Sequence, residues 1–149
     1  MKTLAENKKA FHEYQILETL EAGIALNGQE VKSIRLGRAQ LQGSFVIISK
    51  EQPILLNSEI PAYQPKNAPK DYDSKRNRQL LLNKKEISHL IGKSNEKGLT
   101  LVPLRLYTRQ GKIKLEIGVA KNKTKADKRQ VLKKRAINKD IQRELKNRG

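Results

Sequence analysis

Apolar side chains recur at every second position in the first part of the chain. The even positions of residues 14–26 carry Tyr14, Ile16, Glu18, Leu20, Ala22, Ile24 and Leu26, with Glu18 as the one polar member. This period of two predicts a β-strand that buries one face. Residues 45–48 (FVII) and 54–56 (ILL) are short apolar runs on either side of Glu51-Gln52-Pro53. Two such runs around a turn predict a β-hairpin.

A longer hairpin is predicted later in the chain. Residues 99–107 and 113–119 form its strands, and Gln110-Gly111 forms its turn. The second strand alternates, with Ile113, Leu115, Ile117 and Val119 on one face and Lys114, Glu116 and Gly118 on the other. A glycine inside a strand indicates a bulge or a close approach of the backbone, so Gly118 is expected to mark one of these.

One short helix is predicted between the first strand and the first hairpin. Residues 28–36 carry Val31 and Ile34 three positions apart, and the pattern stops at Gly37. Residues 61–74 contain three prolines and are expected to form a loop.

A second short helix, over residues 84–91, has a clearer start signal. Asn83 can cap it, and Glu86 occupies the third helical position, which together form a capping box. Gly92 is expected to end this helix.

Five or six strands in hairpins, with two short helices inserted, favour a mainly β fold. The strand spacing is typical of a small antiparallel barrel or sandwich. Of these we expect an OB-type antiparallel barrel with short flanking helices, a form common among RNA-binding proteins. This predicted RNA-binding domain spans residues 1–120.

Charge distinguishes this domain from the end of the chain. The formal net charge is +17, and residues 121–149 hold 12 basic and three acidic residues, which account for +9. Such a surplus implies a polyanionic partner, either nucleic acid or a membrane surface. Residues 121–149 also carry an apolar stripe at helical spacing, made of Ile137, Ile141 and Leu145. A helix packed on the body is one interpretation, but the charge favours a tail that is disordered alone and folds on a polyanion.

Several classes of protein are excluded by what the sequence lacks. There is no cysteine, and therefore no disulfide framework or thiolate zinc site. No apolar run approaches the roughly 18 residues of a membrane span, and the charged N-terminus does not resemble a signal peptide, so a cytoplasmic location is expected. His12 and His89 are the only histidines, and no nucleophile elbow, phosphate loop or metal motif occurs. We therefore expect no enzyme, no metal and no cofactor.

Aromatic residues are too few for a base-stacking platform. The chain has six, and Tyr14, Phe45 and Tyr107 fall in strand patterns where core packing is the expected role. Recognition of folded RNA by its shape, through backbone and hydroxyl contacts, fits this composition better than the reading of a splayed single strand.

Seven segments carry a more specific signal than composition does. They are residues 7–14 (NKKAFHEY), 18–24 (ETLEAGI), 28–35 (GQEVKSIR), 76–83 (RNRQLLLN), 98–104 (GLTLVPL), 114–121 (KLEIGVAK) and 127–129 (DKR). In this order they extend over nearly the whole chain, and they resemble small protein B (SmpB), the bacterial family that binds tmRNA, also called SsrA RNA.

The resemblance implies an OB-type barrel and a non-catalytic role in trans-translation, the rescue of stalled ribosomes. The barrel is expected to bind the tRNA-like domain of tmRNA as a monomer. Alanyl-tRNA synthetase and elongation factor Tu are implied as partners through that RNA. The basic tail is expected to enter the empty mRNA channel at the decoding region of the small ribosomal subunit and to become helical there.

The resemblance also assigns residues to the RNA interface. The family's RNA-facing positions fall on Asn7, His12, Glu21, Leu81, Asn83, Ala120 and Lys121. Simpler roles remain open for some of them: Glu21 as a solvated strand residue, Leu81 as a core residue and Asn83 as a helix cap. Against RNA, Glu21 must accept from bases or hydroxyls, because phosphates repel a carboxylate.

In the tail, Asp127, Lys128 and Arg129 match the family's segment for engaging the ribosome. Lys128 and Arg129 can bind ribosomal RNA phosphates, while Asp127 can cap the induced helix. The chain departs from the family at Asn122, where glycine is usual, and at Ala126, where an aromatic residue or histidine is usual. The first departure stiffens the hinge, and the second removes a group that could stack on a base.

Two other functions share part of this profile. A structural ribosomal protein has the same barrel, charge and tail, but stays with ribosomal subunits in high salt. An RNA-modifying enzyme needs a catalytic constellation and a cofactor pocket, which the sequence does not offer. The order of the family segments favours tmRNA binding over both.

Overall fold

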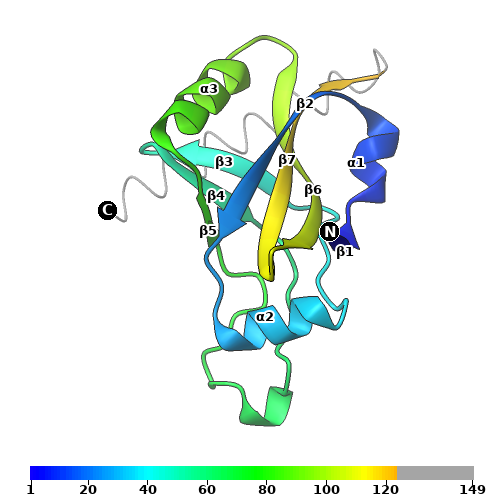
Figure 1. The fold of residues 1–149 in the computed structure, drawn as a ribbon, viewed down its shortest axis with the longest axis vertical. Coiled ribbons are helices and arrows are strands. Elements are labelled where there is room, and N and C mark those ends of the chain that lie inside the picture. Colours follow the sequence, from blue (N-terminus) through cyan, green and yellow to red (C-terminus); the bar gives the residue numbers. More distant parts are fainter. Residues whose placement is uncertain (124–149) are drawn as a thin grey trace.

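The computed structural model describes residues 1–123, which form one antiparallel sheet with three helices (Figure 1). The strands are β1 (Lys2–Glu6), β2 (Tyr14–Ile24), β3 (Phe45–Ser49), β4 (Gln52–Leu56), β5 (Arg78–Leu81), β6 (Leu99–Arg109) and β7 (Lys112–Asn122). The helices are α1 (Lys8–Glu13), α2 (Gly28–Arg35) and α3 (Lys84–Ser94), with a short 3₁₀ helix at Pro65–Asn67. A mainly β fold with short helices is therefore confirmed, while residues 124–149 lie outside the described residues.

The seven strands pair in the order β1-β6-β7-β2-β5-β4-β3, and every pair is antiparallel. No ladder within residues 1–123 joins the two ends of this sheet, so the predicted OB-type barrel is an open sheet here rather than a closed barrel. β3 packs across β6 without pairing with it. One reason is that β1 already occupies an edge of β6 from Arg105 to Thr108, which leaves less of β6 to pair with another strand.

The two hairpins have the same kind of turn, but only one was predicted at the right residues. Gln110 and Gly111 both have positive φ, as the two-residue turns of hairpins require, and this turn is confirmed. In the first hairpin the positive φ values belong to Lys50 and Glu51. Pro53 lies inside β4, opposite Ile48, so the predicted turn at Glu51-Gln52-Pro53 is placed too late.

Gly118 marks a close approach, as its position in a strand suggested. A Cβ at Gly118 would lie 2.8 Å from Cδ1 of Leu104, a distance at which something must shift. The register of β6 against β7 shifts between Pro103 and Arg105, so Leu104 is the extra residue of a bulge on the neighbouring strand. The missing side chain therefore makes room for a buried leucine.

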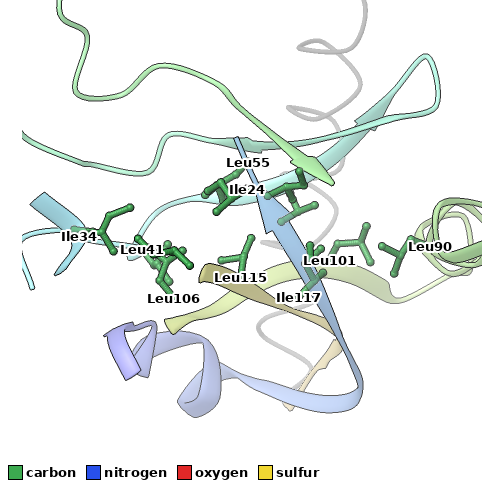
Figure 2. Packing of buried hydrophobic residues seen from close by; sticks show 14 of the residues in the cluster. Ile24, Ile34, Leu41, Leu55, Leu90, Leu101, Leu106, Leu115 and Ile117 are labelled. Atoms are coloured by element: carbon green, nitrogen blue, oxygen red, sulfur yellow. The ribbon is translucent and has the colours of Figure 1, made fainter. Parts of the chain in front are cut away.

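The core has two parts on opposite faces of the sheet. In the larger part, Ile34 of α2 lies beside Leu41 at one end and Leu90 of α3 lies beside Leu101 at the other, with Leu115 of β7 between them (Figure 2). The smaller part lies beneath α1 and is made of Ala10, Tyr14, Val102, Leu104 and Ala120, with Phe11 and Ile16 packed against it. Thus α1 covers one end of the sheet's second face.

The helix starts follow capping rules more closely than the helix ends do. Asn83 caps α3 in a capping box with Glu86, as predicted, and Asn27 caps α2 with Glu30 in the same way. The prediction that Gly92 ends the second helix is wrong, because α3 continues to Ser94. Gly92 faces open space and is tolerated there, and the chain reverses instead at Gly98, which has a positive φ.

A buried charge cluster joins α2 to β5, and sequence reasoning did not find it. Glu30 and Arg78 are both fully buried, and Nε of Arg78 donates to Oε2 of Glu30 at 2.7 Å. Arg78 also donates to the carbonyls of Ser58 and Ser74, while Nη2 of Arg76 donates to Oε1 of Glu30 at 2.6 Å. We call Glu30, Arg76 and Arg78 the α2–β5 lock.

The lock keeps its carboxylate charged. Burial alone raises the pKa of Glu30, but hydrogen bonds from Arg76, the Asn27 N–H and Arg78 outweigh it and hold the pKa below its ordinary value. The two arginines neutralise the buried carboxylate of Glu30, and Glu30 neutralises the buried guanidinium of Arg78. The lock therefore fixes α2 and the end of the loop at residues 61–74 against β5.

Candidate nucleic-acid interface

The sheet has one polar face, formed by alternate residues of four neighbouring strands. In the established register, Glu21 lies opposite Glu116, Gly23 lies opposite both Lys114 and Leu81, and Arg109 lies opposite Lys112. We call the surface made by Glu21, Gly23, Leu81, Tyr107, Arg109, Lys112, Lys114 and Glu116 the outer face. It is the part of the second sheet face that α1 does not cover.

Glu21 is half-buried on this face and held by two neighbours. The hydroxyl of Tyr107 donates to its Oε2 at 2.7 Å, and Nε of Arg109 lies 3.2 Å from the same oxygen. The register brings Glu116 opposite Glu21, and Glu116 is in turn paired with Arg105 at 2.9 Å. Both carboxylates are thus partnered by arginines, so neither presents an uncompensated negative charge.

Leu81 is exposed, which its position in a run of three leucines did not suggest. Its side chain is 55% exposed, whereas Leu80 is buried in the core. A Cβ at Gly23 would lie 3.1 Å from Cβ of Leu81, so the glycine lets this leucine lie against the strand. A large apolar side chain on a polar face is a candidate contact for a partner.

Asn83 lies two residues beyond Leu81, at the start of α3. Its side chain accepts from the N–H of Glu86 at 2.8 Å, so the capping interpretation is confirmed. The residue is also exposed, and because β5 runs antiparallel to β2, the chain beyond Leu81 heads toward the Glu21 end of β2. Capping and binding are therefore compatible at Asn83.

A groove opens beside Leu81, between α2 and the β6–β7 turn. Its volume is about 340 Å³, and its lining comprises Gly23, Ile24, Leu26, Val31, Arg35, Leu81, Gly111, Lys112, Ile113 and Lys114. The lining includes three cations and no carboxylate. Arg35 also donates to the carbonyl of Gly111 at 2.9 Å, which ties the turn to α2. The groove thus has an apolar floor and a basic rim. Such a surface suits a partner that presents both phosphate groups and an exposed apolar surface.

The other family positions gather at the opposite end of β7, around α1. We call Asn7, His12, Ala120 and Lys121 the α1 corner. Ala120 is fully buried beneath α1, and Asn7 is buried, with its Nδ2 donating to the carbonyl of Pro103 at 2.9 Å. His12 and Lys121 are exposed.

The α1 corner also holds the base of the tail. The backbone N–H of Lys123 donates to the carbonyl of Glu13, and its Nζ donates to the carbonyl of Phe11, both at 3.2 Å. The predicted tail residues Asp127, Lys128 and Arg129 lie outside the described residues. Since Ala120 is four residues along β7 from Glu116, the α1 corner lies roughly 13 Å from the centre of the outer face.

Sequence reasoning missed several residues of the outer face. Arg109 and Lys112 were not singled out, and neither was Arg35 in the adjoining groove. The alternation of Lys114 and Glu116 in β7 had nevertheless already placed a charged row on one face. Outside this face, His89 contacts Oε1 of Glu18, which links α3 to β2. Within residues 1–123, no group of three or more potential metal ligands occurs, and no helix is long and apolar enough to cross a membrane.

Comparisons with known proteins agree on one family. The family described as "SmpB protein" matches residues 4–147. The SsrA-binding protein of Sulfurihydrogenibium sp. (strain YO3AOP1) is 50% identical over 145 residues, which cover 97% of this chain and 95% of that protein. The SsrA-binding protein of a Nitratiruptor species is 50% identical over 147 residues, with 98% of each chain covered.

Solved structures also include one that is similar in both fold and sequence. It is described as "tmRNA-SmpB: a journey to the center of the bacterial ribosome". The matched chain superposes with a TM-score of 0.67 at 43% identity, and the match covers 85% of this chain and 92% of that one.

Proposed function

The chain belongs to the SmpB family, and on that premise we propose that it binds the tRNA-like domain of SsrA RNA (tmRNA) and delivers it to stalled ribosomes. It acts as a non-catalytic RNA-binding protein. The identity of about 50% to SsrA-binding proteins over nearly the whole chain carries the proposal.

The outer face supports this function physically. Arg35, Lys112 and Lys114 line the groove beside this face, and Arg109 adds a fourth positive charge on the face itself. Glu21 and Glu116 are each paired with an arginine. Cations supply affinity for the phosphate backbone, and their fixed spacing on a sheet favours one RNA shape over another. Leu81 adds an apolar contact that a plain phosphate-binding surface does not need.

The seven family positions divide into two roles in this proposal. His12, Leu81, Asn83 and Lys121 are exposed and contact RNA, while Glu21 lies within the interface. Asn7 and Ala120 are buried and act by supporting α1 and the end of β7. An OB-type body that is open rather than closed suffices for this, because the outer face involves only four neighbouring strands.

The tail completes the function. Residues 121–149 carry a net charge of +9 and include Asp127, Lys128 and Arg129. We assign this tail to the mRNA channel and decoding region of the small subunit, where it becomes helical on ribosomal RNA. Before this step, alanyl-tRNA synthetase charges the SsrA RNA that this protein holds, and elongation factor Tu carries the complex to the ribosome.

A competition titration tests the proposal. The full chain is titrated with the isolated tRNA-like domain of SsrA RNA, with an ordinary tRNA and a plain RNA duplex as competitors, at two salt concentrations. Preference for the tRNA-like domain that persists at the higher salt supports shape-specific recognition. Equal binding of all three RNAs, lost together as salt rises, contradicts it and favours a structural ribosomal component instead.

A further inference from the structure

A carboxylate in the middle of an RNA-binding face needs an explanation. Glu21 lies between β7 and β5 on the outer face, and its charge opposes the phosphates that Lys112 and Lys114 attract. If its charge acted alone, Glu21 would weaken RNA binding. The contacts of Glu21 show what it does instead.

Glu21 is fixed from below by a buried hydroxyl. Tyr107 is 3% exposed, and its hydroxyl donates to Oε2 of Glu21 at 2.7 Å. Burial, followed by the hydrogen bond to Glu21, raises the pKa of Tyr107 well above its ordinary value, so the hydroxyl remains a donor at any physiological pH. The carboxylate therefore has a defined position rather than a mobile one.

Glu21 in turn fixes Arg109 from the side. Nε of Arg109 lies 3.2 Å from the Oε2 atom that Tyr107 also contacts, and the guanidinium carbon lies 5.9 Å from the centre of the Tyr107 ring. Within residues 1–123, the one other polar contact of this guanidinium is a weak one, from Nη2 to the sulfur of Met1 at 3.8 Å. The side chain is nevertheless 56% exposed.

We propose that Arg109 binds an RNA phosphate on the outer face, and that Glu21 and Tyr107 are positioning residues that aim its guanidinium. With Nε engaged by Glu21, the two Nη groups form the outward edge, which matches the two oxygens of a phosphate. Ordering the side chain before binding reduces the entropy lost on binding. The proposal rests on the proposed function, because the phosphate belongs to the RNA bound there.

A second arginine on the same strand provides an internal control. Nε of Arg105 lies 2.9 Å from Oε1 of Glu116, and its guanidinium lies 5.5 Å from the ring centre of Phe11. The arrangement repeats that of Arg109, but the Arg105 side chain is only 29% exposed and lies beside α1. Arg105→Ala therefore removes a similar charge and ion pair from a position that offers less to a phosphate.

The test is a double-mutant cycle on the full chain with the tRNA-like domain of SsrA RNA. We expect Arg109→Ala to weaken binding about tenfold and to lower the salt slope by about one, as the loss of one charge-assisted phosphate contact does. Glu21→Gln removes a negative charge and is nevertheless expected to weaken binding. In the Arg109→Ala background, Glu21→Gln is expected to cause no further loss.

Two variants separate positioning from folding. Tyr107→Phe keeps the buried ring and removes only the hydroxyl. We expect this variant to bind RNA more weakly than wild type, and we expect the substitution to cause no further loss of affinity in the Arg109→Ala background. Arg105→Ala is expected to leave the salt slope closer to wild type than Arg109→Ala does. Thermal unfolding of each variant confirms that the comparison is made between folded proteins, and Tyr107→Phe keeps the test valid if Glu21→Gln does not fold.

Three outcomes overturn the proposal. Tighter or unchanged binding of Glu21→Gln means that its charge does not serve Arg109. Equal losses from Glu21→Gln with and without Arg109 mean that Glu21 touches the RNA itself. An unchanged salt slope in Arg109→Ala means that Arg109 meets no phosphate. None of these three outcomes contradicts the proposed function. The proposed function fails only if the wild-type protein shows no preference for the tRNA-like domain.

Discussion

Glu30 and Glu21 are two carboxylates with arginine partners on one small sheet protein, and burial gives them opposite roles. Glu30 is fully buried, and one of its two arginine partners, Arg78, is equally buried. Glu21 is about one-third exposed, and its partner Arg109 is more than half exposed. A buried pair must satisfy itself completely, whereas an exposed pair can keep hydrogen-bonding capacity for a ligand.

The family positions divide in the same way. Asn7 and Ala120 are buried in the α1 corner, whereas Leu81 on the outer face and Asn83 at the start of α3 are exposed. The seven positions that the family resemblance assigns therefore include both buried residues, which hold α1 and the end of β7, and exposed residues, which we propose contact RNA. Substitutions of buried residues should therefore reduce stability, and substitutions of exposed residues should reduce RNA binding.

The largest effect is expected from Arg78→Met, which breaks the α2–β5 lock. Removing one member of a fully buried pair costs about 3–5 kcal/mol of unfolding free energy, because Glu30 loses a partner that water cannot replace. Chemical denaturation measures it. Arg76→Met is the matched control, and since Arg76 is partly exposed, its loss should be smaller. Equal losses would contradict the role given to burial.

Asn7→Ala tests a family position on the buried side. The substitution removes the cap of α1 and the hydrogen bond to Pro103, and we expect a loss of about 1–2 kcal/mol in unfolding free energy. Affinity for the tRNA-like domain should remain unchanged under conditions where the variant is folded. His12→Ala, on the exposed side of the same helix, should show little loss of stability. A folded Asn7→Ala protein that fails to bind RNA would place Asn7 in the interface.

Leu81→Ala tests the exposed side. Its effect on stability should be small because the side chain is already half exposed. Binding to the tRNA-like domain should weaken by about tenfold or less, the scale of burying part of one leucine. Leu36→Ala is the matched control, since Leu36 is also 55% exposed but lies at the end of α2. Similar binding by both variants would remove Leu81 from the interface.

The smallest effect is expected near neutral pH and concerns Glu30. Because its pKa is lowered in the folded protein, its contribution to stability is present above its unfolded pKa and is lost as pH falls through its folded pKa. Between neutral pH and mild acid, wild type and Glu30→Gln should therefore keep a constant difference in unfolding free energy. In stronger acid the difference should shrink. A difference that grows toward acid would reverse the assigned pKa direction.

Sequence periodicity predicted the elements that are locally regular. The β6–β7 hairpin followed from alternation and from Gln110-Gly111, and the start of α3 followed from Asn83 and Glu86. The β3–β4 turn was misplaced because Pro53 reads as a turn residue, while Lys50 and Glu51 adopt a positive φ that non-glycine residues rarely show. β1, α1 and β5 were missed because they are short and carry no clear period.

Parts of the structure that depend on contacts between residues far apart in the chain could not be predicted from local sequence patterns. Leu81 is exposed because of its register against Gly23, which a run of three leucines does not encode. The α2–β5 lock joins residues 46 and 48 positions apart, so no local pattern reveals it. Family resemblance supplied the positions proposed for the interface, and the fold distinguished the buried members from the exposed ones.

The most direct test of this account compares Glu21→Gln with Glu30→Gln in two measurements on the same samples. Unfolding free energy is measured by chemical denaturation, and the dissociation constant for the tRNA-like domain is measured where both variants are fully folded. We predict that Glu30→Gln loses the greater stability and binds RNA as wild type does. Glu21→Gln should stay within about 1 kcal/mol of wild-type stability and bind RNA more weakly. Weaker RNA binding by folded Glu30→Gln than by Glu21→Gln would contradict the division of roles by burial.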